Sequence, residues 1–310
     1  MIRKLLLSTP LALTLATPLA AVQADVGARE SPPASVTARP VRIADLAVPL
    51  QPALAISPDG RFFAAVQSRP DPILWIVPAD GGEPFSYRRM WAVYKPRWAP
   101  SGKRIGFIAG IGPPRIWTVE VDPATARPID PPRLLIRTTA NAFAFSPDGE
   151  RVALVASHST AAGVSEIRIV TWETRAERVL LRENGLIYRV DWSPDGQFLY
   201  YGVSPTGFGA EPANFIVRCR VVTGKPTTVR RVGEFLGLSP DGQYLLFRPS
   251  DDKRAAGSSL RMATVDGDTP VEIKVPGGAQ AAWGASSSSL VQISYGDIGD
   301  TIWRLDLRLP

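Results

Sequence analysis

The chain has 310 residues, of which 45% are hydrophobic and 21% charged, and its formal net charge is +6 at pH 7. A single cysteine, Cys219, excludes an intramolecular disulfide, and a single histidine, His158, leaves zinc without the clustered ligands that it needs. The basic residues are scattered along the chain, whereas nucleic-acid-binding surfaces concentrate them in a patch. We therefore expect no nucleic-acid partner.

The first 24 residues have the layout of an export signal. Arg3 and Lys4 give a positive start, an apolar stretch follows, and the small residues before Asp25 suit a cleavage site. The apolar stretch is short and contains two prolines, which disfavours a membrane-spanning helix. We predict cleavage after Ala24, a periplasmic or secreted protein, and no membrane span in the mature chain.

Two short segments precede the first repeat. Residues 25–40 are rich in Ala, Pro and Ser and show no hydrophobic periodicity, which predicts a flexible leader. Residues 41–48 (VRIADLAV) form a candidate strand that belongs to no repeat.

A short motif then occurs six times along the chain. Complete Ser-Pro-Asp-Gly motifs begin at Ser57, Ser146, Ser193 and Ser239, and degenerate copies begin at Ala99 and Gly284. The intervals are 42, 47, 47, 46 and 45 residues, which is too regular for chance. Proline presets its φ and glycine accepts a positive φ, so the motif suits a type I turn between two antiparallel strands.

Each turn follows a strand with one packed face and precedes two or three further apolar strands. Four antiparallel strands recurring at about 45 residues predict a β-propeller blade. The last unit has only three strands before Pro310, so residues 41–48 are expected to complete it and to close the ring. We predict an all-β, six-bladed β-propeller over residues 41–310.

The repeats resemble those of TolB-type propellers, which are related in pattern to WD-type (WD40-like) blades. The motif of an aromatic residue, Ser-Pro-Asp-Gly and a polar residue is matched best at 145–152 and 192–198, and residues 75–84 (WIVPADGGEP) also fit. The resemblance covers residues 41–310 and implies the fold, with little information on activity. Prolyl-oligopeptidase-type enzymes begin with a similar propeller, but this sequence has neither their hydrolase domain nor a G-x-S-x-G nucleophile elbow.

Catalytic and metal-binding groups are sparse in this sequence. A Ser-His-Asp arrangement would have to use His158, which we interpret as a loop residue of the third unit. Residues 266–268 and 295–300 offer oxygen ligands for calcium, but turn chemistry explains both segments more simply. We predict no catalytic residue, no metal site and no cofactor.

The first strand of each unit is expected to line a central channel, which the second and fourth positions before each turn would face. Most of these residues are small, and the polar exceptions are Lys95, Arg97, Arg189, Asp191 and Gln280. Charged groups in a narrow passage cost desolvation energy unless water or partners satisfy them. Two interpretations follow: an anion-accepting mouth, for example for a carboxylate, or an internal ion pair of Asp191 with Arg97 or Arg189.

Aromatic and arginine residues occur in the loops expected at the same end of the channel, at Arg88, Arg89, Trp91, Tyr94 and Phe208. Such residues favour a protein interface, although ordinary solvated loops also contain exposed aromatics.

Together these features predict an exported, monomeric, non-catalytic binding or scaffold protein whose partner is another envelope protein or a peptide. The alternatives are a hydrolase or lyase acting in the central channel, and a peptide-binding remnant of a propeller-bearing serine peptidase.

Overall fold

The computed structural model of the chain describes residues 35–67, 72–87, 93–110, 112–157, 163–205, 214–249, 259–266, 269–275, 280–297 and 299–308. These residues form 24 β-strands and include no helix. The described part of the chain therefore contains no helix that could span a membrane. The fold is all-β and propeller-like, as the sequence predicts. The predicted signal sequence and residues 25–34 of the predicted leader lie outside the described residues.

The first four repeats each form a sheet of four antiparallel strands in chain order. The first sheet consists of β2 (Leu50–Ile56), β3 (Phe62–Gln67), β4 (Leu74–Pro78) and β5 (Phe85–Tyr87). The second consists of β6 (Tyr94–Trp98), β7 (Arg104–Ala109), β8 (Arg115–Glu120) and β9 (Arg133–Ile136). The third consists of β10 (Ala142–Phe145), β11 (Arg151–Ser157), β12 (Val164–Thr171) and β13 (Glu177–Asn184). The fourth consists of β14 (Leu186–Trp192), β15 (Phe198–Ser204), β16 (Asn214–Arg220) and β17 (Pro226–Val232).

The last two repeats share one eight-stranded sheet with the N-terminal strand. In sheet order its strands are β18 (Glu234–Leu238), β19 (Tyr244–Arg248), β20 (Ser259–Thr264), β21 (Val271–Lys274), β1 (Ser35–Leu46), β24 (Asp300–Leu307), β23 (Ser289–Ser294) and β22 (Gln280–Trp283). The first three residues of β1 pair in parallel with β21, and residues 38–46 pair antiparallel with β24. β1 therefore joins the two repeats.

Residues 41–46 pair with the C-terminal strand, as the sequence predicts. The assignment of residues 35–40 to a flexible leader was wrong, because β1 already begins at Ser35. Its first residues find backbone partners in β21, and Val36, only 4% exposed, is buried in the apolar cluster of the eight-stranded sheet.

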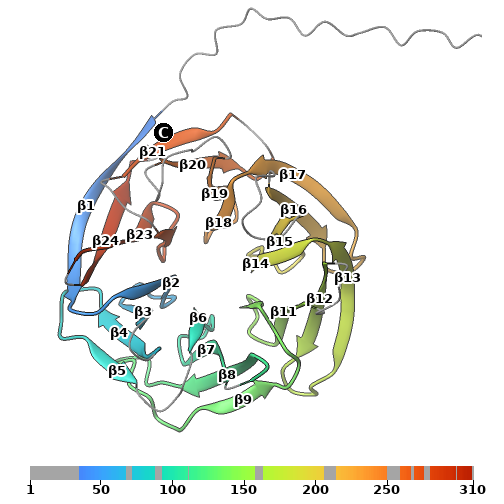
Figure 1. The fold of residues 1–310 in the computed structure, drawn as a ribbon, viewed down its shortest axis with the longest axis horizontal. Helices are drawn as coiled ribbons and strands as arrows, with labels where there is room; N and C mark the ends of the chain where they lie inside the picture. Colours follow the sequence, from blue (N-terminus) through green and yellow to red (C-terminus); the bar gives the residue numbers. More distant parts are fainter. Residues whose placement is uncertain are drawn as a thin grey trace, which may run out of the picture. The chain divides into compact units, whose positions relative to one another are not determined.

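The innermost strands follow one another in a closed cycle (Figure 1). β2 contacts β6, and the contacts continue through β10, β14, β18 and β22 back to β2. Between neighbouring sheets, buried apolar side chains such as Phe107 and Tyr201 form separate clusters. As a result of this packing, one edge of each innermost strand lies toward a common centre.

The four complete Ser-Pro-Asp-Gly turns share one hydrogen-bond pattern, which the fourth sheet illustrates. The Gly196 amide donates to the Ser193 carbonyl at 2.9 Å, and Gly196 has a φ of 68°, which an L side chain rarely adopts. The Ser193 hydroxyl accepts from the Phe198 amide at 2.9 Å and donates to the Asp195 carboxylate. Each turn thus fixes where an innermost strand ends, and with it which residues face the centre.

Candidate functional site

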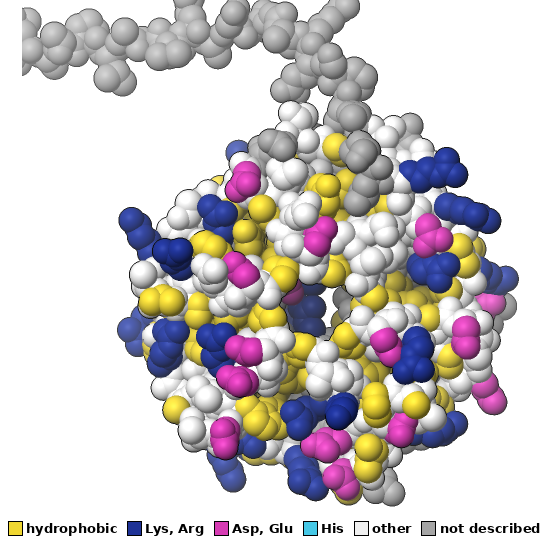
Figure 2. Space-filling model, turned by 180° about the vertical axis from the view of Figure 1, so that it is seen from behind, with side chains coloured by type: hydrophobic (Ala, Val, Ile, Leu, Met, Phe, Trp, Pro, Cys, Tyr) yellow, Lys and Arg dark blue, Asp and Glu magenta, His cyan; other side chains and the backbone are white. Residues whose placement is uncertain are grey.

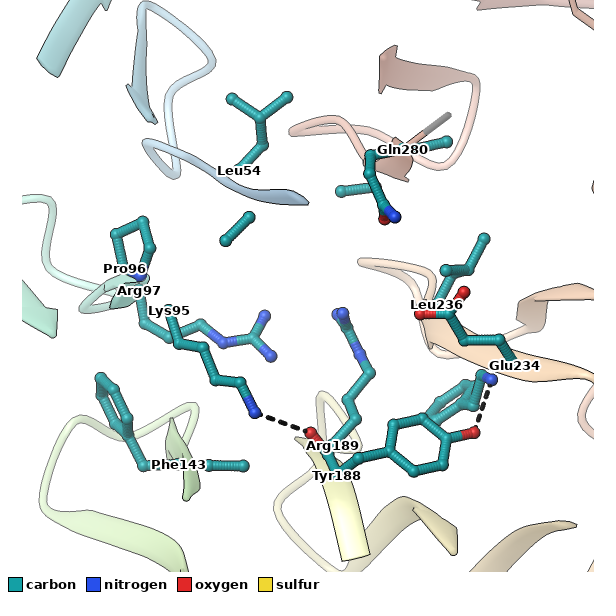
Figure 3. A pocket seen from close by; sticks show the side chains of 15 residues that line it. Leu54, Lys95, Pro96, Arg97, Phe143, Tyr188, Arg189, Glu234, Leu236 and Gln280 are labelled. Atoms are coloured by element: carbon teal, nitrogen blue, oxygen red, sulfur yellow. Dashed lines mark hydrogen bonds between the residues drawn. The ribbon is translucent and has the colours of Figure 1, made fainter. Parts of the chain in front are cut away.

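The innermost strands enclose a cavity of about 280 Å³ at the starts of those strands, where the loops lead into them (Figure 3). We name it the loop-side cavity. Its lining residues are Ala53, Leu54, Lys95, Pro96, Arg97, Ala142, Phe143, Tyr188, Arg189, Glu234, Phe235, Leu236, Gln280, Ala281 and Ala282. Every repeat contributes through its innermost strand, so closure of the ring is what assembles the site.

A second cavity of about 460 Å³ lies at the opposite ends of these strands, and we name it the turn-side cavity. Its charged lining residues are Arg97, Arg189 and Asp191, and turn prolines such as Pro58 and Pro194 also line it. Arg97 and Arg189 each line both cavities, whereas Asp191 lines only the turn-side cavity. Figure 2 shows the hollow at the centre of the molecule, with basic side chains visible inside it.

Lys95 reaches into the loop-side cavity from an irregular part of β6. The β6–β7 register shifts between Tyr94 and Arg97, and Lys95 adopts a left-handed φ of 50°, which is uncommon outside glycine. Its Nζ donates to the carbonyl of Asn141 at 2.7 Å and to that of Tyr188 at 3.2 Å. Burial, together with the nearby charges of Arg97 and Arg189, lowers the pKa of Lys95 to about 8.

Arg97 and Arg189 share one carboxylate between them. Arg189 Nε donates to Asp191 Oδ2 at 2.7 Å, and Arg97 Nη2 lies 3.4 Å from Asp191 Oδ1. Burial and repulsion by Arg189 lower the pKa of Arg97 to about 10, although Asp191 opposes this shift. Burial disfavours the ionised form of Asp191, but the two guanidinium groups outweigh it and hold the pKa of that carboxyl below its usual range.

This arrangement combines the two sequence-based interpretations. Asp191 forms the predicted internal ion pairs, with both arginines at once, and also accepts from the Leu238 amide at 3.3 Å. These contacts connect β6, β14 and β18 across the centre. Only the two arginines pair with Asp191, whereas Lys95 donates to backbone carbonyls, so positive charge remains in excess in the loop-side cavity. Gln280 lines the same cavity from β22.

Two polar residues that line the loop-side cavity, Tyr188 and Glu234, were not expected from the sequence. The Tyr188 hydroxyl accepts from the Phe235 amide at 2.8 Å, and burial raises its pKa. Glu234 lines the same cavity and pairs with Arg248 at 2.9 Å. The β14–β15 register shifts at Tyr188, so strict alternation counted back from the turn fails there. Tyr188 and Glu234 each stand five positions before the serine of their turn, so this spacing could have identified both residues.

The predicted partner-binding loops are described only at Tyr94, because Arg88, Arg89, Trp91 and Phe208 lie outside the described residues. Tyr94 is half-buried against the apolar cluster between the second and third sheets, and it borders a smaller cavity of about 230 Å³ beside the central one. Packing therefore accounts for its position. Its predicted role at an interface stays a prediction.

Two kinds of reactive group can be assessed among the described residues. Within the described ranges, no group of three or more His, Cys, Asp or Glu side chains could hold a metal ion. Cys219 is 1% exposed, and burial raises the pKa of its thiol to about 12, so it is not nucleophilic at neutral pH. His158 lies outside the described residues. The loop-side cavity itself offers hydrogen-bond donors and positive charge.

No family model matches the sequence, and no curated protein sequence matches it. Solved structures with a similar fold share little sequence. TolB from Acinetobacter baumannii aligns with a TM-score of 0.58 at 17% identity, covering 75% of this chain and 56% of that one, so the chain spans just over half the length of that protein. A protein assigned as TolB from Agrobacterium tumefaciens aligns with a TM-score of 0.59 at 17% identity, covering 83% of this chain and 90% of that one.

The Cps50 (Swd1) β-propeller domain of Myceliophteria thermophila aligns with a TM-score of 0.51 at 13% identity, covering 81% of this chain and 82% of that one. The predicted resemblance is thereby confirmed at the level of structure. The chain has a fold similar to that of TolB and of a WD-type β-propeller.

Proposed function

We propose that this chain is an exported, non-catalytic binding or scaffold module that holds its partner at the loop-side end of the central channel. The observation that carries the proposal is the loop-side cavity, which takes residues from the innermost strand of every repeat and presents Lys95, Arg97 and Arg189 together. A concave cavity with largely apolar walls and a few converging polar groups suits recognition. The structural likeness to TolB supports a binding or scaffold role.

The blade count belongs to the same proposal. We count six blades, taking the eight-stranded sheet as two blades joined by β1. In support, six innermost strands contact one another in one cycle, and a separate apolar cluster packs at each junction between consecutive repeats. Only the first three residues of β1 bridge the two blades, through parallel pairing with β21.

The partner is another envelope protein or a peptide, and the chain itself is a monomer. Export to the periplasm is supported by the signal-like sequence of residues 1–24. A non-catalytic role is supported by the lining of the loop-side cavity. Its carboxylate, Glu234, is held by Arg248, and its phenol, Tyr188, already accepts a backbone hydrogen bond.

Partner capture with matched arginine variants tests the proposal. The wild type, the double variant Arg97→Met/Arg189→Met and the control Arg133→Met are crosslinked in periplasmic extract, and the captured proteins are identified by mass spectrometry. Arg133 is a suitable control because its side chain is 73% exposed on β9 and pairs only locally with Asp130. Circular dichroism confirms that each variant is folded.

We expect one partner to be captured by the wild type and by the control, and to be lost from the folded double variant. Equal capture by all three proteins would contradict a role for the cavity. Capture of nothing specific by the wild type would contradict the binding role itself.

A further inference from the structure

We propose that the group which enters the loop-side cavity is the free C-terminal carboxylate of an extended peptide. This inference rests on the proposed binding function and names the chemistry of its ligand. Three features of the cavity support it: an excess of positive charge, hydrogen-bond donors left over by Asp191, and a size that fits one chain end.

The excess of positive charge faces the loop side. Lys95, Arg97 and Arg189 all line the loop-side cavity, but Asp191, the carboxylate that both arginines share, lines the turn-side cavity only. The one acidic side chain among the loop-side lining residues, Glu234, is 42% exposed and already pairs with Arg248. An incoming anion therefore meets three cations, and the one carboxylate that lines the same cavity is already paired with Arg248.

The two arginines keep donors available for a second carboxylate. A guanidinium carries five N–H groups in a planar fork that matches a carboxylate. Asp191 accepts from Nε of Arg189 and lies near one Nη of Arg97, so most N–H groups of both side chains are not used by it. Figure 3 shows both guanidinium groups pointing into the middle of the cavity. Their pairing with Asp191 shows that both guanidinium groups already bind one carboxylate from the turn side.

The shape of the cavity favours the end of a chain over its middle. Its volume of about 280 Å³ is at the lower limit of ordinary ligand pockets, which begin near ~300 Å³, and suits roughly one terminal residue. Leu54, Phe143 and Leu236 give it apolar walls for the last side chain. Arg97 and Arg189 lie at its inner limit, since they also line the turn-side cavity. When an extended chain enters by its C-terminal end, the terminal carboxylate is the group that reaches Arg97 and Arg189.

Defined peptides separate this inference from its alternatives. The probes are a fluorescein-labelled Ser-Gly-Ser-Gly-Ala-Leu peptide with a free C-terminus, the same peptide as its C-terminal amide, the amide with Asp in place of Leu, and N-acetyl-leucine as competitor. Fluorescence polarisation at pH 7 and low salt measures the affinities for the wild type, Arg97→Met, Arg189→Met and the control Arg133→Met. Thermal unfolding confirms that each variant is folded.

We expect the free acid to bind at least about tenfold more tightly than either amide, and each cavity variant to lose about tenfold or more in affinity, as the loss of a charged hydrogen bond predicts. The control should match the wild type. Equal affinity for the free acid and its amide would overturn the inference. So would tightest binding of the amide with Asp in place of Leu, or binding of N-acetyl-leucine as tight as that of the peptide.

Absence of peptide binding would also overturn it. The partner-capture experiment then decides whether the proposed binding function still holds. Capture that still depends on Arg97 and Arg189 would leave the binding function in place with a different ligand group, whereas capture indifferent to these arginines would contradict the proposed function as well.

Discussion

At the scale of single residues, Asp191 offsets the repulsion between Arg97 and Arg189, the two arginines of the loop-side cavity. It is the carboxylate that holds Arg97 and Arg189, and it also accepts from the Leu238 amide of the next inner strand. Breaking a buried ion pair from one side leaves uncompensated charge, which costs more than the pair contributes. The same carboxylate partly neutralises the site that an external anion would use.

Asp191→Asn should therefore change stability and anion binding in opposite directions. The side chain is 14% exposed, so we expect a loss of about 1–3 kcal/mol in the free energy of unfolding, below the range for fully buried pairs. Binding of the free-acid peptide should tighten several-fold, because Asn no longer competes for the guanidinium groups. Urea unfolding and fluorescence polarisation measure the two effects. A variant that binds the peptide more weakly while remaining folded would contradict this role of Asp191.

Part of this site could be read from the sequence. Counting back by two and four from each turn identified Lys95, Arg97, Arg189 and Asp191, because the turn fixes the end of the strand and the strand alternates. The same counting missed Tyr188, because a bulge inserts a residue into β14. It also could not decide between an ion pair and an anion site, since that depends on which cavity each side chain lines.

At the scale of elements, the turn serine holds each of the four complete Ser-Pro-Asp-Gly hairpins through its side-chain hydroxyl. In the fourth sheet Ser193 is 7% exposed, and its hydroxyl accepts from the Phe198 amide and donates to Asp195. The hydrogen bond from Ser193, followed by that from the Gln197 amide, lowers the pKa of Asp195. The turn of the second repeat has Ala99 in place of this serine, and its Ser101 accepts only one longer bond, of 3.3 Å, from the Lys103 amide.

Ser193→Ala should lower the free energy of unfolding by about 1–2 kcal/mol, because the partly buried Phe198 amide loses its side-chain acceptor. The matched control Ser101→Ala should change it by less than about 0.5 kcal/mol, since that side chain is exposed. A carboxyl with a lowered folded-state pKa stabilises the fold above its unfolded-state pKa and loses this contribution as pH falls. Ser193→Ala should thus also weaken the acid dependence below about pH 4. Equal losses for the two variants in urea unfolding would contradict this account.

At the scale of the whole molecule, the N-terminal strand closes the ring. The sequence predicted that residues 41–48 complete the last unit, because that unit was one strand short. The parallel pairing of residues 35–37 with β21 could not be predicted, because this segment shows no apolar alternation and Val36 is its only buried side chain. Those residues are held mainly by backbone pairing, which leaves little trace in a sequence.

Closure by β1 predicts a position-dependent loss of stability. Leu46 is 4% exposed and packs with Val291, Ile293 and Ile302. Leu46→Ala should lower the free energy of unfolding by about 2–4 kcal/mol, within the range for buried leucines. Thr37→Ala, at an exposed position of the same strand, should change it by less than about 0.5 kcal/mol. If chemical unfolding showed Leu46→Ala to be as stable as Thr37→Ala, β1 would not be packed on the last repeat.

The central claim is that Lys95, Arg97 and Arg189 share one cavity with too few carboxylates to neutralise them. An NMR pH titration of the Lys95 side chain tests it most directly, with Lys95→Met used for assignment. The claim predicts a pKa of about 8, which should rise in Arg97→Met and on binding of the free-acid peptide, because both changes reduce repulsion of the ammonium group. A Lys95 that titrates near the ordinary value of 10.5, and does not respond to either change, would contradict the claim.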